Sequence, residues 1–453
     1  MTDVAPFESL STGERSRSWR LRFRLREWLA RSLVVVPILY IAGALVLAEA
    51  VSAIEGDHDL LGLKMDVDTA RTSLSAVAGG MIAFTGLVVS LAVLVVQFGA
   101  SQYTPRLVSR FRRDPVVKHA LGIFIAPAIY ALVSLRIIGR DGSTVVPSLT
   151  VSLAVLLLIV AVLVFFVLVS RLLDLLRPRR VIAQIVEQAM AAIDDVYPFA
   201  LGMTPSLELG PEAPAERVVA HDGDPAVLAA IDRARLVRAA AAAGVVVEVA
   251  VGIGEYMPTG SPLFLIRGEP ARIDLPELRR SAILEDERTI AQDPAFAIRA
   301  IVDTALRALS PAVNDPTTAV QALDGVESLL LALAGRDLRR GRLADADGRL
   351  RLIYPTPRWA DLLDLGLDEA RHYGTGSPQI ARRLRSLLLN LKASTPPSLH
   401  PALDDQLARL DVAVAAAYPD PVERAHAEVP DHLGLGAARR STSPQPTAED
   451  PPR

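Results

Sequence analysis

The chain has 453 residues, of which 51% are hydrophobic and 22% charged, and its formal net charge is −3 at pH 7. This weakly acidic balance gives no reason to expect a nucleic-acid partner. The sequence contains no cysteine, which excludes disulfides, thiolate metal sites and cysteine nucleophiles.

Four long apolar stretches lie in the first 176 residues, and no other follows them. They cover about residues 32–54, 73–98, 120–138 and 145–170. A helix rises about 1.5 Å per residue, so roughly 20 apolar residues cross a hydrocarbon core of about 30 Å. We therefore predict a mostly α membrane protein with four transmembrane helices.

The basic residues predict the orientation of these spans. Lys and Arg number 16 in the N-terminal segment, the second connection and the segment after the fourth span, against four in the two other connections. By the positive-inside rule, we expect both termini in the cytoplasm.

The second span has the most distinctive pattern. Small and polar residues recur on one face at spacings of three and four, and this small-residue stripe consists of Thr72, Ala76, Gly79, Ala83, Gly86, Ser90 and Gln97. Small residues let helix backbones approach closely, and ordinary helix packing is the common interpretation of such a pattern. The alternative is a narrow pore, lined by this face if several copies assemble. Ionisable residues are nearly absent from the spans, which disfavours a coupled transporter.

The rest of the chain is predicted to form an α+β region in the cytoplasm. A small β-rich module contains two strand-like segments, 245–251 and 262–266, joined by a glycine-containing turn. This form resembles the hairpin of biotinyl- and lipoyl-type barrel-sandwich domains, but the module has no lysine, so we expect no prosthetic group and no other cofactor. The predicted order is a basic N-terminal segment (1–31), the transmembrane domain (32–176), a stalk helix and linker (177–215), the β-rich module (216–268), a helical domain (269–437) and a disordered tail (438–453).

Two Asp-Pro pairs mark the starts of a helical hairpin. Asp293-Pro294 and Asp315-Pro316 each place a capping residue before a proline at the first helical position. The predicted helices are 294–309 and 316–334, with residues 310–315 as the connector.

Three segments together identify a resemblance. They are Gln97-Phe-Gly-Ala-Ser-Gln-Tyr-Thr-Pro-Arg106, Glu287-Arg-Thr-Ile-Ala-Gln-Asp-Pro294 and Ala308-Leu-Ser-Pro-Ala-Val-Asn-Asp-Pro-Thr-Thr-Ala319. They resemble an uncharacterised bacterial membrane-protein family known as domain of unknown function 2254. The most specific part is the motif formed by Ser310, Pro311, Asn314, Asp315 and Pro316, which we interpret as a structural turn. The resemblance covers about residues 20–420 and implies a multi-pass protein of the bacterial cytoplasmic (inner) membrane without an established activity.

The polar residues do not predict catalysis. The carboxylates at 285–287 are consecutive and point in different directions on a helix, and the histidines lack zinc-ligand spacing. We therefore expect no metal site and no enzyme.

Two functions remain. The favoured one is a homo-oligomeric channel or pore in the lipid bilayer, lined by the second span and gated by the cytoplasmic domain. The alternative is a membrane-tethered ligand-sensing or scaffold protein without transport activity.

Overall fold

The computed structural model describes residues 32–55, 66–102, 114–138, 148–175, 177–197, 199–202, 215–269, 273–338 and 341–435. The predicted basic N-terminal segment and disordered tail, and residues 103–106 of the first family segment, lie outside these residues. The chain divides into two compact units, with the boundary after Arg180.

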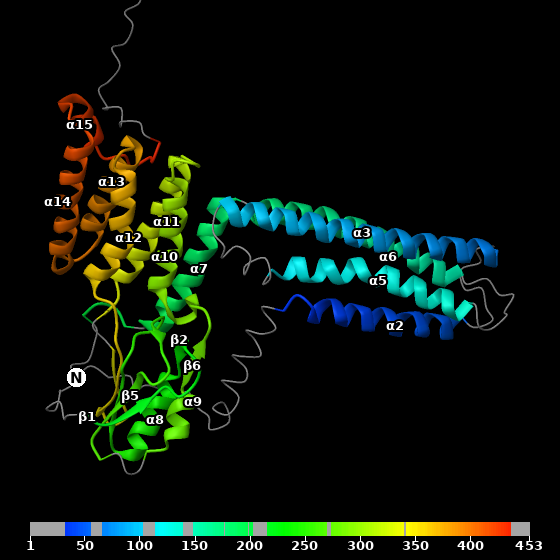
Figure 1. Cartoon of the computed structure of the whole chain (residues 1–453), viewed down its shortest axis with the longest axis horizontal. Coiled ribbons are helices and arrows are strands. Elements are labelled where there is room, and N and C mark those ends of the chain that lie inside the picture. Colours follow the sequence, from blue (N-terminus) through cyan, green and yellow to red (C-terminus); the bar gives the residue numbers. More distant parts are fainter. Residues whose placement is uncertain are drawn as a thin grey trace, which may run out of the picture. The chain divides into compact units, whose positions relative to one another are not determined.

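The first unit consists of four long helices that run beside one another (Figure 1). They are α2 (Val35–Glu55), α3 (Val67–Gln102), α5 (Pro115–Ile138) and α6 (Ser148–Leu175). Each is long and apolar enough to cross a membrane, so the four predicted spans are all present as helices. α5 packs against the other three and is the central helix of the bundle.

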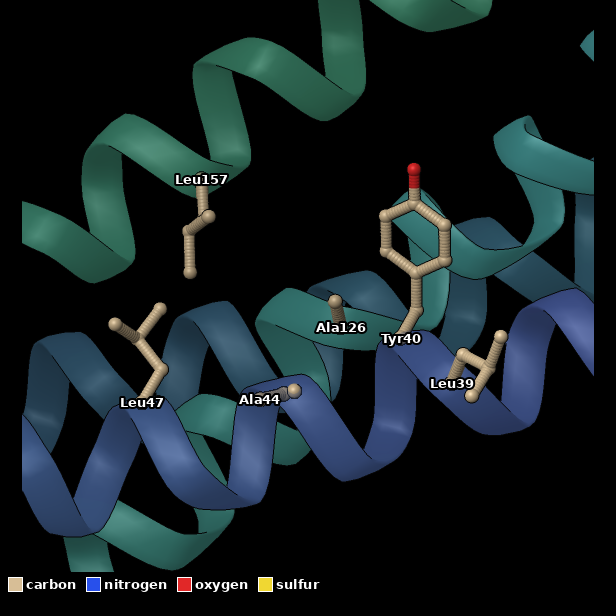
Figure 2. Close-up of a pocket in the computed structure, with 7 residues that line it drawn as sticks. Leu39, Tyr40, Ala44, Leu47, Ala126 and Leu157 are labelled. Atoms are coloured by element: carbon tan, nitrogen blue, oxygen red, sulfur yellow. The ribbon is translucent and has the colours of Figure 1, made fainter.

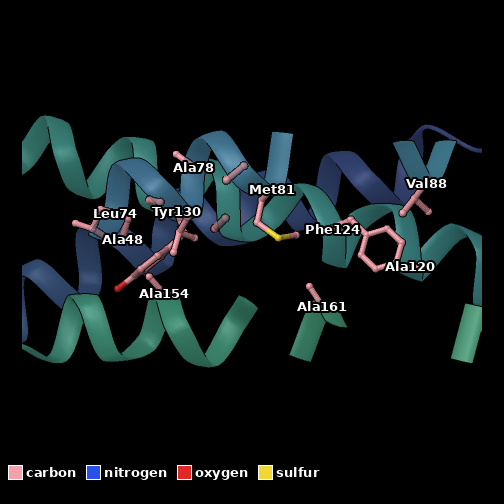
Figure 3. Packing of buried hydrophobic residues seen from close by; sticks show 14 of the residues in the cluster. Ala48, Leu74, Ala78, Met81, Val88, Ala120, Phe124, Tyr130, Ala154 and Ala161 are labelled. Carbon is pink, nitrogen blue, oxygen red and sulfur yellow. The ribbon is translucent and has the colours of Figure 1, made fainter. Parts of the chain in front are cut away.

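Small buried side chains and a few large ones alternate in the bundle core (Figure 3). Ala120 and Ala161 are fully buried where helices approach closely. Phe84 packs edge to face against Phe124 at 5.6 Å and Phe165 at 5.3 Å between ring centroids, which joins α3, α5 and α6. Such pairs add to the stabilisation from area burial by about 0.5–1.5 kcal/mol each.

The second unit contains two separate sheets. A five-stranded sheet has the order β1-β5-β3-β8-β7, antiparallel except for the parallel pair β3–β8, and a three-stranded antiparallel sheet has the order β4-β2-β6. The strands are β1 (Ala215–Ala220), β2 (Ala226–Ile231), β3 (Val246–Val249), β4 (Tyr256–Met257), β5 (Pro262–Arg267), β6 (Ala282–Glu285), β7 (Arg342–Ala344) and β8 (Leu350–Ile353). Among the described strands no sheet closes into a barrel. The expected hairpin-like pairing is present between β3 and β5, but β6, β7 and β8 come from the range predicted as helical.

The remaining elements are helices. They are α7 (Pro178–Val196), α8 (Arg233–Ala243), α9 (Leu275–Arg280), α10 (Pro294–Ala308), α11 (Pro316–Ala334), α12 (Trp359–Gly374), α13 (Pro378–Ser394), α14 (His400–Ala417) and α15 (Pro421–Ala427), with short 3₁₀ turns η2 (Ile290–Gln292) and η3 (Pro397–Leu399). α10 packs against α11 and α12, and α13 packs against α11 and α14. The predicted fold class, four membrane helices followed by an α+β region, is confirmed.

Candidate functional site

The small-residue stripe of the second span, the α3 stripe, lies on the side of its helix that faces away from the bundle core. All of its members, Thr72, Ala76, Gly79, Ala83, Gly86, Ser90 and Gln97, are exposed in the single chain. The opposite side of α3 is buried and includes Leu74, Met81 and Val88. Packing within one chain therefore does not account for the stripe.

The glycines of the stripe have open space beside them. An added Cβ atom on Gly79 or Gly86 would meet nothing within 4 Å. Ile82 and Leu87, which flank these glycines, are 56% and 68% exposed. Exposed positions on the other helices also carry large side chains, such as Phe166 of α6 at 62% exposure.

The hydroxyl groups of the stripe are satisfied within α3. Thr72 Oγ1 donates to the Asp68 carbonyl at 2.8 Å, and Ser90 Oγ donates to the Gly86 carbonyl at 2.9 Å. Burying a hydroxyl in an apolar environment costs little free energy when the hydroxyl donates a hydrogen bond to a carbonyl of its own helix. A neighbouring helix could therefore contact the stripe mainly through close packing. The polar groups available to it are two hydroxyl oxygens and the amide of Gln97.

An ion pair joins α5 and α6 at the ends that meet the predicted cytoplasmic side. Asp114 Oδ2 accepts from Arg171 Nε at 2.8 Å, while Asp114 Oδ1 accepts from the Val116 amide at 2.9 Å and caps α5. The Asp114 side chain is 4% exposed and that of Arg171 30%. This pair fixes two helix ends at the level where the chain passes from α6 into α7.

The predicted motif at 310–316 forms the tight connection between α10 and α11. Ser310 Oγ donates to the Arg307 carbonyl at 2.7 Å, and Asn314 has a φ of +48°, in the left-handed region that asparagine tolerates. Asp315 caps α11 by accepting from the Thr318 amide at 3.0 Å, and Pro316 is its first residue. Pro311 is exposed at the tip. The motif therefore lies at the turn between α10 and α11, and its structural role stays a prediction.

The segment Glu287–Pro294 connects the three-stranded sheet to α10. Gln292 pairs with both backbone groups of Ile231 on β2, at 3.0 and 3.3 Å. Asp293 caps α10 and receives two hydrogen bonds from Arg288, at 2.9 and 3.2 Å. Burial raises the pKa of the Asp293 carboxyl above its ordinary value, although the charge of Arg288 opposes the shift. Gly254, with φ +88°, packs so closely on this pair that a Cβ atom would clash with both side chains.

Two arginines hold the C-terminal end of α7. Arg233 at the start of α8 donates to the Val196 carbonyl at 3.2 Å and the Asp195 carbonyl at 2.8 Å. Arg336 after α11 donates to the Tyr197 carbonyl at 3.2 Å. These bonds satisfy carbonyls that a helix end leaves unpaired. The sequence predicted the stalk helix, but it did not predict that these two arginines contact the end of that helix.

Within the described ranges, no three His, Asp or Glu side chains are close enough to hold a metal ion.

Comparison with known proteins also indicates a membrane protein. A family model described as a predicted membrane protein (DUF2254) matches residues 30–390. An uncharacterised protein of Mycobacterium bovis is 30% identical over 385 residues, which cover 82% of this chain and 72% of that protein. An uncharacterised protein of Mycobacterium tuberculosis matches with the same identity and coverage. No solved structure matches.

Proposed function

We propose that several copies of this chain assemble in the bacterial cytoplasmic membrane with their α3 stripes facing a common axis. The chain belongs to the DUF2254 family of predicted membrane proteins. The assembly is a narrow channel lined by α3. The extramembrane unit lies in the cytoplasm and gates it.

The observation that carries this proposal is the exposure of the whole stripe opposite the core face of α3. Lipid tails are as apolar as Leu, so helices in a membrane associate through close packing and polar contacts, which small residues permit. Repetition of one surface around an axis gives a closed ring of copies. Ser90 and Gln97 would then contribute oxygen atoms to the lining.

The length of α3 supports a path across the membrane and beyond. Its 36 residues extend about 54 Å at 1.5 Å per residue, against a hydrocarbon core of about 30 Å. The stripe ends at Gln97, near the helix end that precedes the basic segment with Arg106 and Arg110.

α7 follows α6 in the chain, and in this proposal it links the gating unit to the channel. It begins three residues after α6 ends, and its far end is held by Arg233 and Arg336. A movement of α8 or of the end of α11 would therefore act on the C-terminal end of α7.

A second function has its own support. The hydroxyls of Thr72 and Ser90 already bond within α3, which suits a dry packing seam. In that case the copies assemble as a membrane-tethered sensor or scaffold without transport. Neither function assigns a catalytic step to the chain.

Ion flux and thiol labelling separate the two functions. The full chain with Ala83→Cys is reconstituted into vesicles, and a membrane-impermeant thiol reagent is added. A channel predicts ion flux that the reagent blocks, with Val46→Cys on the exposed face of α2 as the unaffected control. Absence of flux across a range of voltage and tension, with Ala83→Cys unreactive, contradicts the channel and leaves the scaffold.

A further inference from the structure

An apolar groove lies between α2 and α6 on the surface of the membrane unit. Its volume is about 280 Å³, and it is lined by Leu39, Tyr40, Gly43, Ala44, Leu47, Ala126 and Leu157. Figure 2 shows Leu157 of α6 on one side, with Tyr40 and Leu47 of α2 at the two ends and the small side chains of Ala44 and Ala126 between them. The groove exists because these positions are small, and a Cβ atom on Gly43 would meet nothing within 4 Å.

The groove opens to the exterior of the bundle. Leu39 is 65% exposed and Leu47 36%. The eight-residue separation from Leu39 to Leu47 corresponds to about 12 Å along α2. The groove therefore runs along the helix axis, the direction that a lipid acyl chain follows in a bilayer. An α-helix with side chains has a diameter of about 10–12 Å, which is too wide for this space.

One end of the groove carries polar groups. Tyr40 Oη and His119 Nδ1 are 3.2 Å apart, and the two rings meet edge to face with centroids 5.9 Å apart. Tyr40 lies in the second turn of α2 and His119 in the second turn of α5, so both are near the same membrane surface. His119 is exposed, and an imidazole and a phenol at this depth can donate to a phosphate oxygen.

We propose that this groove binds one acyl chain of a glycerophospholipid, with the phosphate of that lipid against Tyr40 and His119. The lipid comes from the leaflet that meets the N-terminal ends of α2 and α5. The site requires no assembly of copies and no pore, so its failure would leave the proposal for α3 unchanged.

A photoreactive lipid tests this site in the full chain. The protein is reconstituted with a phosphatidylcholine that carries a diazirine in one acyl chain, irradiated, and mapped by peptide mass spectrometry. We expect labelling concentrated on the groove residues of α2 and α6. Gly43→Phe fills the groove and should abolish the concentration of label on these residues, because the phenyl ring occupies the space that the acyl chain would take. Val46→Phe places the same side chain on an exposed face of α2, where Val46 is 68% exposed, and should leave the labelling unchanged.

Headgroup contact is measured separately. Native mass spectrometry after detergent washing should find one retained phospholipid on the wild type and less on His119→Ala, which keeps the groove intact. Even labelling along all exposed helix faces, or unchanged labelling in a folded Gly43→Phe variant, would mean ordinary surrounding lipid and overturn the proposal. If Gly43→Phe does not fold, an absence of retained lipid on the wild type overturns it equally.

Discussion

The two carboxylate oxygens of Asp114 serve different partners, so two substitutions can separate their contributions. Oδ1 caps α5 through the Val116 amide, and Oδ2 pairs with Arg171. Asp114→Asn retains an oxygen that can cap the helix but places an amide donor opposite a guanidinium donor. Asp114→Ala removes both interactions.

The geometry sets the expected magnitudes. A hydrogen bond to a charged group contributes about 1.5–3 kcal/mol, and the 30% exposure of the Arg171 side chain reduces the value through solvent screening. We expect Asp114→Asn to lower the free energy of unfolding by about 1–2 kcal/mol. Loss of the cap adds about 1 kcal/mol, so Asp114→Ala should cost about 2–3 kcal/mol.

Unfolding in mixed micelles, followed by circular dichroism, measures these differences. A double-mutant cycle with Arg171→Met should give a coupling energy of about 1–2 kcal/mol between the two side chains. If Asp114→Asn is as stable as the wild type while Asp114→Ala is not, the cap alone matters and the ion-pair reasoning is refuted.

Other contacts give further predictions. Gly325 of α11 packs on α7, where an added Cβ would lie 2.7 Å from Ile182 Cγ2. Gly325→Ala should therefore accelerate hydrogen exchange in α7, because overpacking of about 1–3 kcal/mol outweighs the gain of about 1 kcal/mol in helix propensity. Gly80→Ala, with nothing within 4 Å, should not slow or speed exchange of α7, and equal exchange in both variants would contradict the packing. Asp293→Asn and Glu369→Gln should change the pH dependence of stability in opposite directions. Burial raises the pKa of Asp293, so the folded state holds its proton longer, and the variant should gain stability relative to the wild type as pH rises above about 4. A hydrogen bond from an arginine lowers the pKa of Glu369, so the wild type should lose this stabilisation as pH falls through the acid range while Glu369→Gln does not change there. Urea unfolding at several pH values checks both signs, and parallel pH profiles for the two variants would contradict them.

Local signals in the sequence predicted the elements well. The apolar runs located the four membrane helices, and Asp315-Pro316 located the start of α11 because a cap and a fixed φ act within one turn. The α3 stripe was visible for the same reason, since it depends only on helical spacing. Whether its exposed surface meets another copy stays a prediction.

Contacts between distant segments could not be predicted in this way. The parallel pair β3–β8 joins residues about a hundred positions apart, so the β-rich module extends into a range whose local pattern was helical. The same limit applies to Arg233 and Arg336 on the end of α7, because an arginine's partner is decided by the tertiary fold. Gly254 shows this limit most clearly. A side chain at this position would clash with Asp293 and Arg288, which are far along the chain.

The contact between α3 helices of neighbouring copies can be measured directly, because the natural chain has no cysteine. Single cysteines are introduced at Ala76, Ala83 or Ser90 of the stripe, and at Val46 of α2 or Leu163 of α6, which are 68% and 60% exposed. Mild oxidation in native membranes should produce disulfide-linked dimers from the three stripe positions and not from the other two. Dimers at Val46 or Leu163 without any at the stripe would contradict an assembly built around α3.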